Sequence, residues 1–329
     1  MSSNHCVGNR RSMLLAMAAA ALPLGTARAQ DAYPSRPITF VVGWPPGGPS
    51  DNVARLIAPA MGEALGQSVV IDNRAGAGGN IGSQLAARAK PDGYTMMLAT
   101  VASHGLNSAL YAKLNYDPIG DFAPIGMISS SPSTLLVPVD APYRSAKDVI
   151  EAAKAQPGKL NYGSGGIGSS QHLAGARFRN LVGIDVVHVP FKGTAPAIVD
   201  LMAGRLDYIL TTGAVTFVRS GKLRALAVAA RDRIPALPDV PTFDEAGVPG
   251  FYTDNWYGLV APAGTPRPVL EKLNAALGKA IESPTVKQQF IEQGAAAVKA
   301  MDIDAFWTFV QKQMPEAAEM VRMAGAKVE

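Results

Sequence analysis

The chain has 329 residues, which exceeds one typical core and predicts two domains of ordinary size. With 48% hydrophobic and 17% charged residues, the composition excludes a disordered chain. Three of the 30 basic residues lie in the first 30 positions, which leaves 27 basic and 26 acidic residues in the rest of the chain. This balanced charge gives nucleic-acid binding no electrostatic support.

The first 30 residues have the features of an export signal. An arginine pair at 10–11 precedes an apolar stretch at 13–24, whose shortness disfavours an uncleaved membrane anchor. Ala-Arg-Ala at 27–29 fits a cleavage site, so we expect a periplasmic mature chain that begins near Gln30, with the secretory and twin-arginine routes both open. The only cysteine, Cys6, lies in this segment, so no disulfide, thiolate metal site or cysteine nucleophile is expected in the mature chain.

From residue 38 the chain alternates short apolar runs with helix-like stretches, which is typical of βαβ units and parallel sheet. Strands are expected at 38–42, 68–71, 94–99, 133–138, 160–162, 186–189, 207–210, 223–229 and 256–260. Helices are expected at 52–65, 80–89, 171–181, 195–202, 268–281 and 303–323, with a kink at Pro59, and from Ser145, which has Asp148 as capping-box partner. The stretch 233–249 is Pro-rich and irregular.

This order of elements indicates a chain that crosses twice between two α/β lobes. After a signal peptide at 1–30, we expect the first lobe at 31–131 plus 254–329 and the second at 132–253.

Motifs of catalysis are not found in the sequence, which has no G-x-S-x-G, H-E-x-x-H, P-loop or EF-hand pattern. His104, His172 and His188 are well separated and have no carboxylate at ligand spacing, so we interpret them as structural or rim residues and predict no metal or cofactor. A periplasmic enzyme using His172 or His188 is the remote alternative, because it would need a base or nucleophile with an orienting partner.

Four glycine-rich turns carry the clearest signal, at 44–51, 73–80, 161–170 and 191–196. The first, third and fourth follow expected strands and precede expected helices, where free N–H groups and the helix dipole favour an anion. Plain turns or flexible surface loops are the alternatives. The second turn has only a superficial dinucleotide fingerprint, and we interpret it as a close-packing turn.

Ligands of open α/β sheets bind beyond the carboxyl ends of the strands, so the first, third and fourth turns would meet in one cleft. Ser50 or Asp51 would cap the first helix, and Lys192 would contact an anion or stay solvated. Trp44 and Phe191 would cover an apolar or aromatic midsection, which favours an aromatic or medium-chain dicarboxylate.

Several motifs together resemble one family. They are YPSRPI at 33–38, PPGG at 45–48 followed by Asp51, NRAGAGGNIG at 73–82, PDGYT at 91–95, DFAPI at 121–125, PGKLNY at 157–162, HLAG at 172–175, VHVPFKG at 187–193, GKLRALA at 221–227, LPDVPT at 237–242 and GLVAPAGTP at 258–266. In this order, over essentially the whole mature chain, they resemble the solute receptors of tripartite tricarboxylate transporters, the Bug-type extracytoplasmic receptors.

The resemblance implies a type II periplasmic-binding-protein fold, with two α/β lobes joined by a hinge and a ligand cleft between them. It implies a receptor, which we expect to be monomeric, that captures a di- or tricarboxylate, an acidic amino acid or an aromatic acid for membrane permease subunits. Presentation of the ligand to a sensor kinase is the alternative. The family holds ligand carboxylates largely by backbone amides, hydroxyls and ordered waters.

Two departures from the family pattern concern the site. Trp44 stands where many relatives carry Phe or Tyr. The stretch 210–220 looks shortened against the usual family stretch, which carries an Asn or Asp after the strand, and here Thr211 and Thr212 stand at its start. The candidate ligand contacts are Trp44, Gly47, Gly48, Asp51, Thr100, Ser103, Gly163, Ser164, Gly165, Ser169, Lys192, Gly193, Thr194, Pro196, Thr211 and Thr212.

Overall fold

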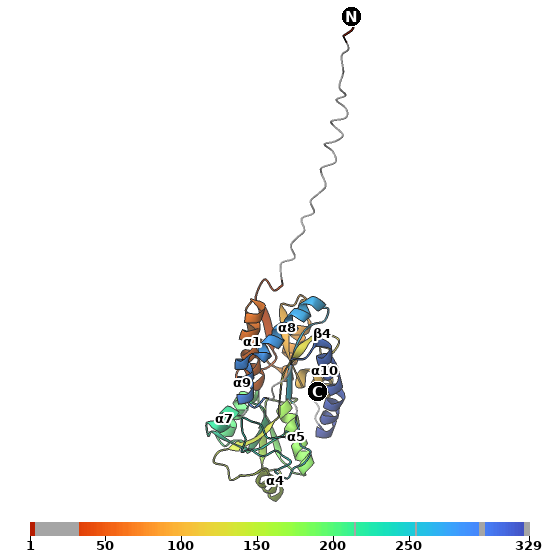
Figure 1. Cartoon of the computed structure of the whole chain (residues 1–329). Helices are drawn as coiled ribbons and strands as arrows, with labels where there is room; N and C mark the ends of the chain where they lie inside the picture. The colour runs from red at the N-terminus through yellow and green to blue at the C-terminus, as the bar shows by residue number, and fades with distance from the viewer. Residues whose placement is uncertain (4–32, 214, 254, 296–299, 326–329) are drawn as a thin grey trace.

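Two five-stranded sheets, each covered by helices, form the two lobes of the molecule (Figure 1). The computed structural model describes residues 1–3, 33–213, 215–253, 255–295 and 300–325. The strand order is β2-β1-β3-β10-β4 in the first lobe and β7-β6-β8-β5-β9 in the second. The predicted α/β fold with two lobes is therefore confirmed.

The first lobe combines the N-terminal third of the chain with its C-terminal part. Its strands are β1 (Ile38–Val42), β2 (Val69–Asn73), β3 (Thr95–Thr100), β4 (Phe122–Ser131) and β10 (Asn255–Pro262). Its helices are α1 (Pro49–Leu65), α2 (Asn80–Ala87), α3 (Asn107–Leu110), α8 (Arg267–Glu282), α9 (Pro284–Glu292) and α10 (Ile303–Ala324), with a 3-10 turn at Ala77–Gly79 and a π-helix at Ala102–Leu106.

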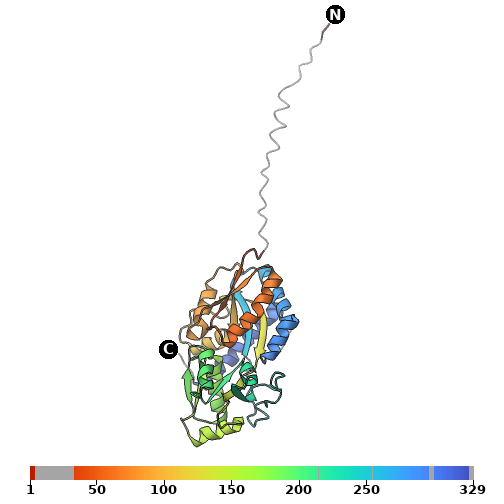
Figure 2. The same cartoon turned by 90° about the vertical axis from the view of Figure 1, so that its left-hand side faces the viewer.

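The second lobe is built from the middle of the chain. Its strands are β5 (Thr134–Pro138), β6 (Asn161–Ser164), β7 (Val187–Pro190), β8 (Tyr208–Thr211) and β9 (Leu223–Val228). Its helices are α4 (Ala146–Ala155), α5 (Ser170–Val182), α6 (Thr194–Met202) and α7 (Val215–Arg219). Figure 2 shows this lobe stacked below the first.

Both sheets are mixed, which corrects the expectation of parallel sheet. β1 pairs in parallel with β2 and β3, and β6 pairs in parallel with β7 and β8. β10 runs antiparallel to β3 and β4, and β5 runs antiparallel to β8 and β9. These antiparallel strands are the ones that enter a sheet from the other lobe, so no βαβ crossover fixes their direction.

The expected elements are present with small shifts at their ends. The capping box of α4 is confirmed, because Ser145 Oγ accepts the Asp148 N–H and the Asp148 carboxylate accepts the Ser145 N–H. The expected cap of the first helix is wrong: α1 begins three residues earlier, with Gly48 as N-cap and Pro49 as first residue, and has no side-chain cap. Pro59 lies inside α1 as expected.

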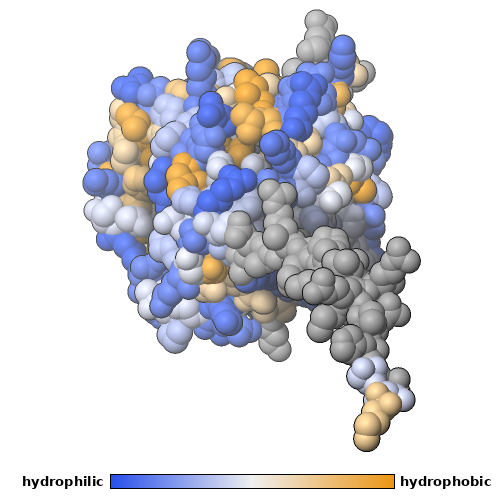
Figure 3. All heavy atoms as spheres, turned by 90° about the horizontal axis from the view of Figure 1, so that it is seen from above, coloured by the Kyte–Doolittle hydropathy of each residue, from blue (hydrophilic) through white to orange (hydrophobic). Residues whose placement is uncertain are grey.

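Apolar side chains fill both faces of each sheet. In the first lobe, Phe40, Ile57 and Leu273 belong to a core on the α1 and α8 face, whereas Trp256 and Phe306 belong to a core beneath α10. Hydrophilic side chains dominate the outer face of this lobe, with apolar side chains in small separate groups (Figure 3). α10 packs on β4 and also contacts α5, so one long helix bridges the lobes (Figure 1).

The chain passes from the first sheet to the second between Ser131 and Thr134 and returns between Val228 and Asn255. The lobe limits at 131/132 and 253/254 stay a prediction. The expected signal sequence and its cleavage site lie outside the described residues. Among the helices of the described part, none combines the length and apolarity needed to cross a membrane.

Candidate functional site

Three helices begin at the junction of the two lobes. α1 follows the loop after β1, whereas α5 and α6 follow the loops after β6 and β7. The N-cap residues of α1 and α6, Gly48 and Gly193, provide no side-chain cap, whereas Ser169 caps α5 by accepting the His172 N–H at 3.3 Å. Uncapped first-turn N–H groups and three helix dipoles therefore point positive potential at this junction.

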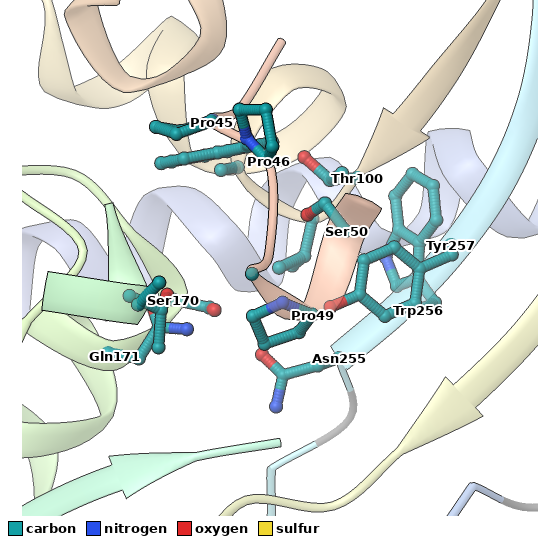
Figure 4. A pocket seen from close by; sticks show the side chains of 16 residues that line it. Pro45, Pro46, Pro49, Ser50, Thr100, Ser170, Gln171, Asn255, Trp256 and Tyr257 are labelled. Atoms are coloured by element: carbon teal, nitrogen blue, oxygen red, sulfur yellow. The ribbon is translucent and has the colours of Figure 1, made fainter. Parts of the chain in front are cut away.

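A small cavity of about 30 Å³, here called the cleft cavity, lies where these helices begin (Figure 4). Its sixteen lining residues come from both lobes and none carries a formal charge. They are Trp44, Pro45, Pro46, Gly48, Pro49, Ser50, Thr100, Val101, Ala102, Ser170, Gln171, Thr194, Ala195, Asn255, Trp256 and Tyr257. An anion here would be held by neutral donors, as expected from the sequence.

Neutral hydrogen-bonding side chains connect the walls of the cleft cavity. Gln171 Nε2 donates to Thr211 Oγ1 at 3.3 Å within the second lobe, and Tyr257 Oη lies 3.5 Å from Thr212 Oγ1 across the cleft. Burial raises the pKa of the Tyr257 phenol, so the group stays protonated and available as a donor. In Figure 4, Gln171 and Ser170 face Pro49, Ser50 and Tyr257 across the cavity.

Thr100 and Ser103 form a buried hydroxyl pair at the end of β3. Ser103 Oγ accepts the Thr100 N–H at 3.0 Å and lies 2.9 Å from His104 Nδ1. The pair stands at the start of the π-helix Ala102–Leu106, a form of helix often found at functional sites. Thr100 lines the cleft cavity, whereas Ser103 supports it from behind.

A second cavity of about 170 Å³, here called the side cavity, adjoins the cleft cavity. The two cavities share Gly48, Pro49, Thr194 and Ala195 as a common wall. The other lining residues are Gly47, Asn52, Ile198, Val199, Met202, Thr211, Thr212, Gly213 and Phe217.

Seven of the sixteen candidate contacts line these two cavities, and nine lie elsewhere. Trp44, Gly48, Thr100 and Thr194 line the cleft cavity, and Gly47, Gly48, Thr194, Thr211 and Thr212 line the side cavity. Those elsewhere are Asp51, Ser103, Gly163, Ser164, Gly165, Ser169, Lys192, Gly193 and Pro196. The ligand contacts themselves stay a prediction.

Comparison with known proteins identifies the family. The family described as "Tripartite tricarboxylate transporter family receptor" matches residues 53–325. The chain belongs to this family. BugT of Bordetella pertussis is 35% identical over 91% of this receptor and 92% of its own length, so the predicted resemblance to Bug-type receptors is confirmed.

Two solved structures of Rhodopseudomonas palustris proteins are similar to this receptor. MatC, with bound malate, is 36% identical with a TM-score of 0.83, covering 88% of this chain and 100% of that chain. A second protein, with adipate, is 34% identical with a TM-score of 0.87, covering 90% and 100%. The chain is a periplasmic solute-binding receptor.

In this receptor the hydroxyls of the third glycine-rich turn are engaged within the turn itself. Ser164 Oγ accepts the Gly166 N–H at 3.1 Å and lies 2.7 Å from His188 Nε2. Ser169 Oγ donates to the Gly166 carbonyl at 2.7 Å. Both serines are buried, and their bonds fix the backbone that precedes α5.

The description of the histidines as well separated is wrong in space, although it holds along the chain. The His172 and His188 rings stack with centroids 4.1 Å apart, and Tyr162 stacks on the other side of His188. Strand β7 brings His188 beside α5, which the spacing of 16 positions did not reveal. Burial, the neighbouring His172 and Arg179 lower the pKa of His188 to about 4, so the stack is neutral at pH 7.

Several lining residues were missed by the sequence analysis. Asn255 and Tyr257 reach the cleft cavity from β10, more than 150 positions after the first turn, and no local motif marks them. Ser170 and Gln171 directly follow the third turn and were within reach of its helix-start signal.

Proposed function

We propose that this receptor captures a small organic carboxylate and delivers it to the permease subunits of a tripartite transporter. The observation that carries the proposal is the meeting of three helix N-termini at a cavity lined only by uncharged residues. The malate and adipate in the two R. palustris structures support the same ligand class. Export through the N-terminal signal, transfer of the ligand without catalysis and a monomeric receptor are parts of this proposal.

A thermal-shift series on the full chain tests the ligand class. A ligand that binds only the folded state at about 100 times its Kd adds about 2.7 kcal/mol of stability, so malate or adipate should raise the Tm by several degrees. Adipamide, which matches adipate in shape but carries no charge, should leave the Tm unchanged. Equal shifts from adipate and adipamide, or none from any carboxylate, would contradict the proposal.

A further inference from the structure

We propose that the ligand of this receptor is a carboxylate with an uncharged, apolar far end, which lies in the side cavity between α1, α6 and α7. The inference rests on the proposed function, since it places the carboxylate in the cleft cavity. The two cavities share Gly48, Pro49, Thr194 and Ala195, so a molecule held by its carboxylate at the helix N-termini lies directly beside the side cavity.

Apolar side chains of α6 and α7 form part of the wall of the side cavity. Ile198, Val199 and Met202 contribute one wall from α6, and Phe217 contributes another from α7. Val199 is 53% exposed and Met202 is 37% exposed, so a ligand would cover apolar surface that now faces solvent. A volume of about 170 Å³ has room for a short aliphatic chain or one ring, since a cavity of about 150 Å³ takes benzene.

The walls of the side cavity also offer no ionic partner to a charged far end. No lining residue of either cavity is acidic or basic. The nearby Asp51 carboxylate is engaged with Gly47, Arg55 and Asn73, and Asp200 is paired with Arg205. An ammonium or a second carboxylate in the side cavity would lose water and gain no ionic partner.

Two threonines at the end of β8 complete the wall of the side cavity. Thr211 and Thr212 also line the side cavity. Their hydroxyls are already directed to Thr212 O and towards Tyr257, which leaves a neutral surface. These threonines and the apolar side chains of α6 and α7 therefore both favour a ligand with an uncharged far end.

Three six-carbon acids test the inference by calorimetry on the full chain at pH 7. Hexanoate should bind at least about tenfold more tightly than adipate or 2-aminoadipate, because only hexanoate has an uncharged, apolar far end. Val199→Lys, at an exposed position of the side cavity, should reverse the ranking of hexanoate and adipate. Met202→Lys provides a second test at the same wall should Val199→Lys fail to fold.

Two control variants separate this site from its surroundings. Val187→Lys, at a 48% exposed valine of β7 that lines neither cavity, should leave the ranking unchanged. Met323→Lys changes a residue that lines a larger cavity of about 590 Å³ between α5 and α10. If Met323→Lys reversed the ranking of hexanoate and adipate and Val199→Lys did not, the inference would be overturned. Tighter binding of adipate by the wild type would also overturn it, with the proposed function intact. Binding of none of these acids or malate would reject both.

Discussion

Asp51 illustrates how a charged residue beside a ligand cleft acts as support. The residue is 1% exposed, and its carboxylate accepts hydrogen bonds from the Gly47 N–H at 2.9 Å, from Arg55 Nε at 2.8 Å and from Asn73 Nδ2 at 3.0 Å. Burial alone would raise the pKa of Asp51, but these hydrogen bonds outweigh it and hold that pKa below its ordinary value. The residue therefore stabilises the first glycine-rich turn from behind and leaves the N–H groups of α1 free for an anion.

Asp51→Asn should lower the free energy of unfolding by about 1–3 kcal/mol at pH 7, because it weakens charge-assisted hydrogen bonds to a buried group. A carboxyl with a lowered pKa stabilises the fold above its ordinary pKa, and this contribution is lost as pH falls through the lowered value. The difference in the free energy of unfolding between wild type and variant should therefore become smaller below about pH 4. Urea unfolding at pH 7 and pH 3 measures this difference, and Asp232→Asn, at an exposed position, is the control. A gap that stays constant with pH would contradict this assignment.

At the scale of elements, two histidines join β7 to α5 behind the third turn. His188 lies between Tyr162 and His172, and its Nε2 is 2.7 Å from Ser164 Oγ. Arg179 adds positive charge nearby, and the pKa of His172 is also lowered, chiefly by burial. Protonation would place like charges on stacked rings, so the neutral state of both rings is part of how this loop holds its shape.

Stability should accordingly fall as pH drops from about 6.5 to about 4. A histidine whose pKa is lowered by folding binds protons first in the unfolded state, so its stabilising contribution is complete above its ordinary pKa and lost below it. After allowance for partial exposure, His188 should account for about 1 kcal/mol of that loss. Urea unfolding of His188→Gln across this range should show a correspondingly smaller loss, and an unchanged pH dependence would exclude His188 as its source.

The sequence predicted those elements whose local pattern agrees with their tertiary role. β4 was missed because FAPIGMISSS contains Pro, Gly and three serines, which favour a loop; its long antiparallel pairing with β10 overrides that preference. The turns before α1, α5 and α6 were predicted because glycine has a local signature. Asn255 and Tyr257 could not be predicted as site residues, because they reach the cleft only where the chain returns to the first lobe and forms β10.

At the scale of the whole molecule, the lobes are closed on each other. Asn180 Nδ2 donates to the Met323 carbonyl at 2.6 Å, and Tyr257 reaches Thr212 across the cleft. A cleft cavity of about 30 Å³ holds about one or two water molecules, which is less than any dicarboxylate needs. We expect the lobes to separate to admit a ligand and then to close around it, as the predicted hinge would allow.

Gly193 is a position where the closed lobes leave little room for a side chain. It has a φ of +115°, and a Cβ placed on it would lie 2.9 Å from Cγ of Pro45 in the other lobe. Gly193→Ala should therefore keep the lobes apart and weaken adipate binding at least about tenfold, or about 1.4 kcal/mol.

Gly204→Ala is the matched control, because Gly204 lies in the same lobe at a φ of +70° with nothing within 4 Å of the added Cβ. Both variants should lose stability through backbone strain, since alanine disfavours positive φ. Only Gly193→Ala should lose affinity by calorimetry and fail to compact with adipate in small-angle scattering. If both variants bound adipate equally well, the contact between Pro45 and Gly193 would have no part in closure.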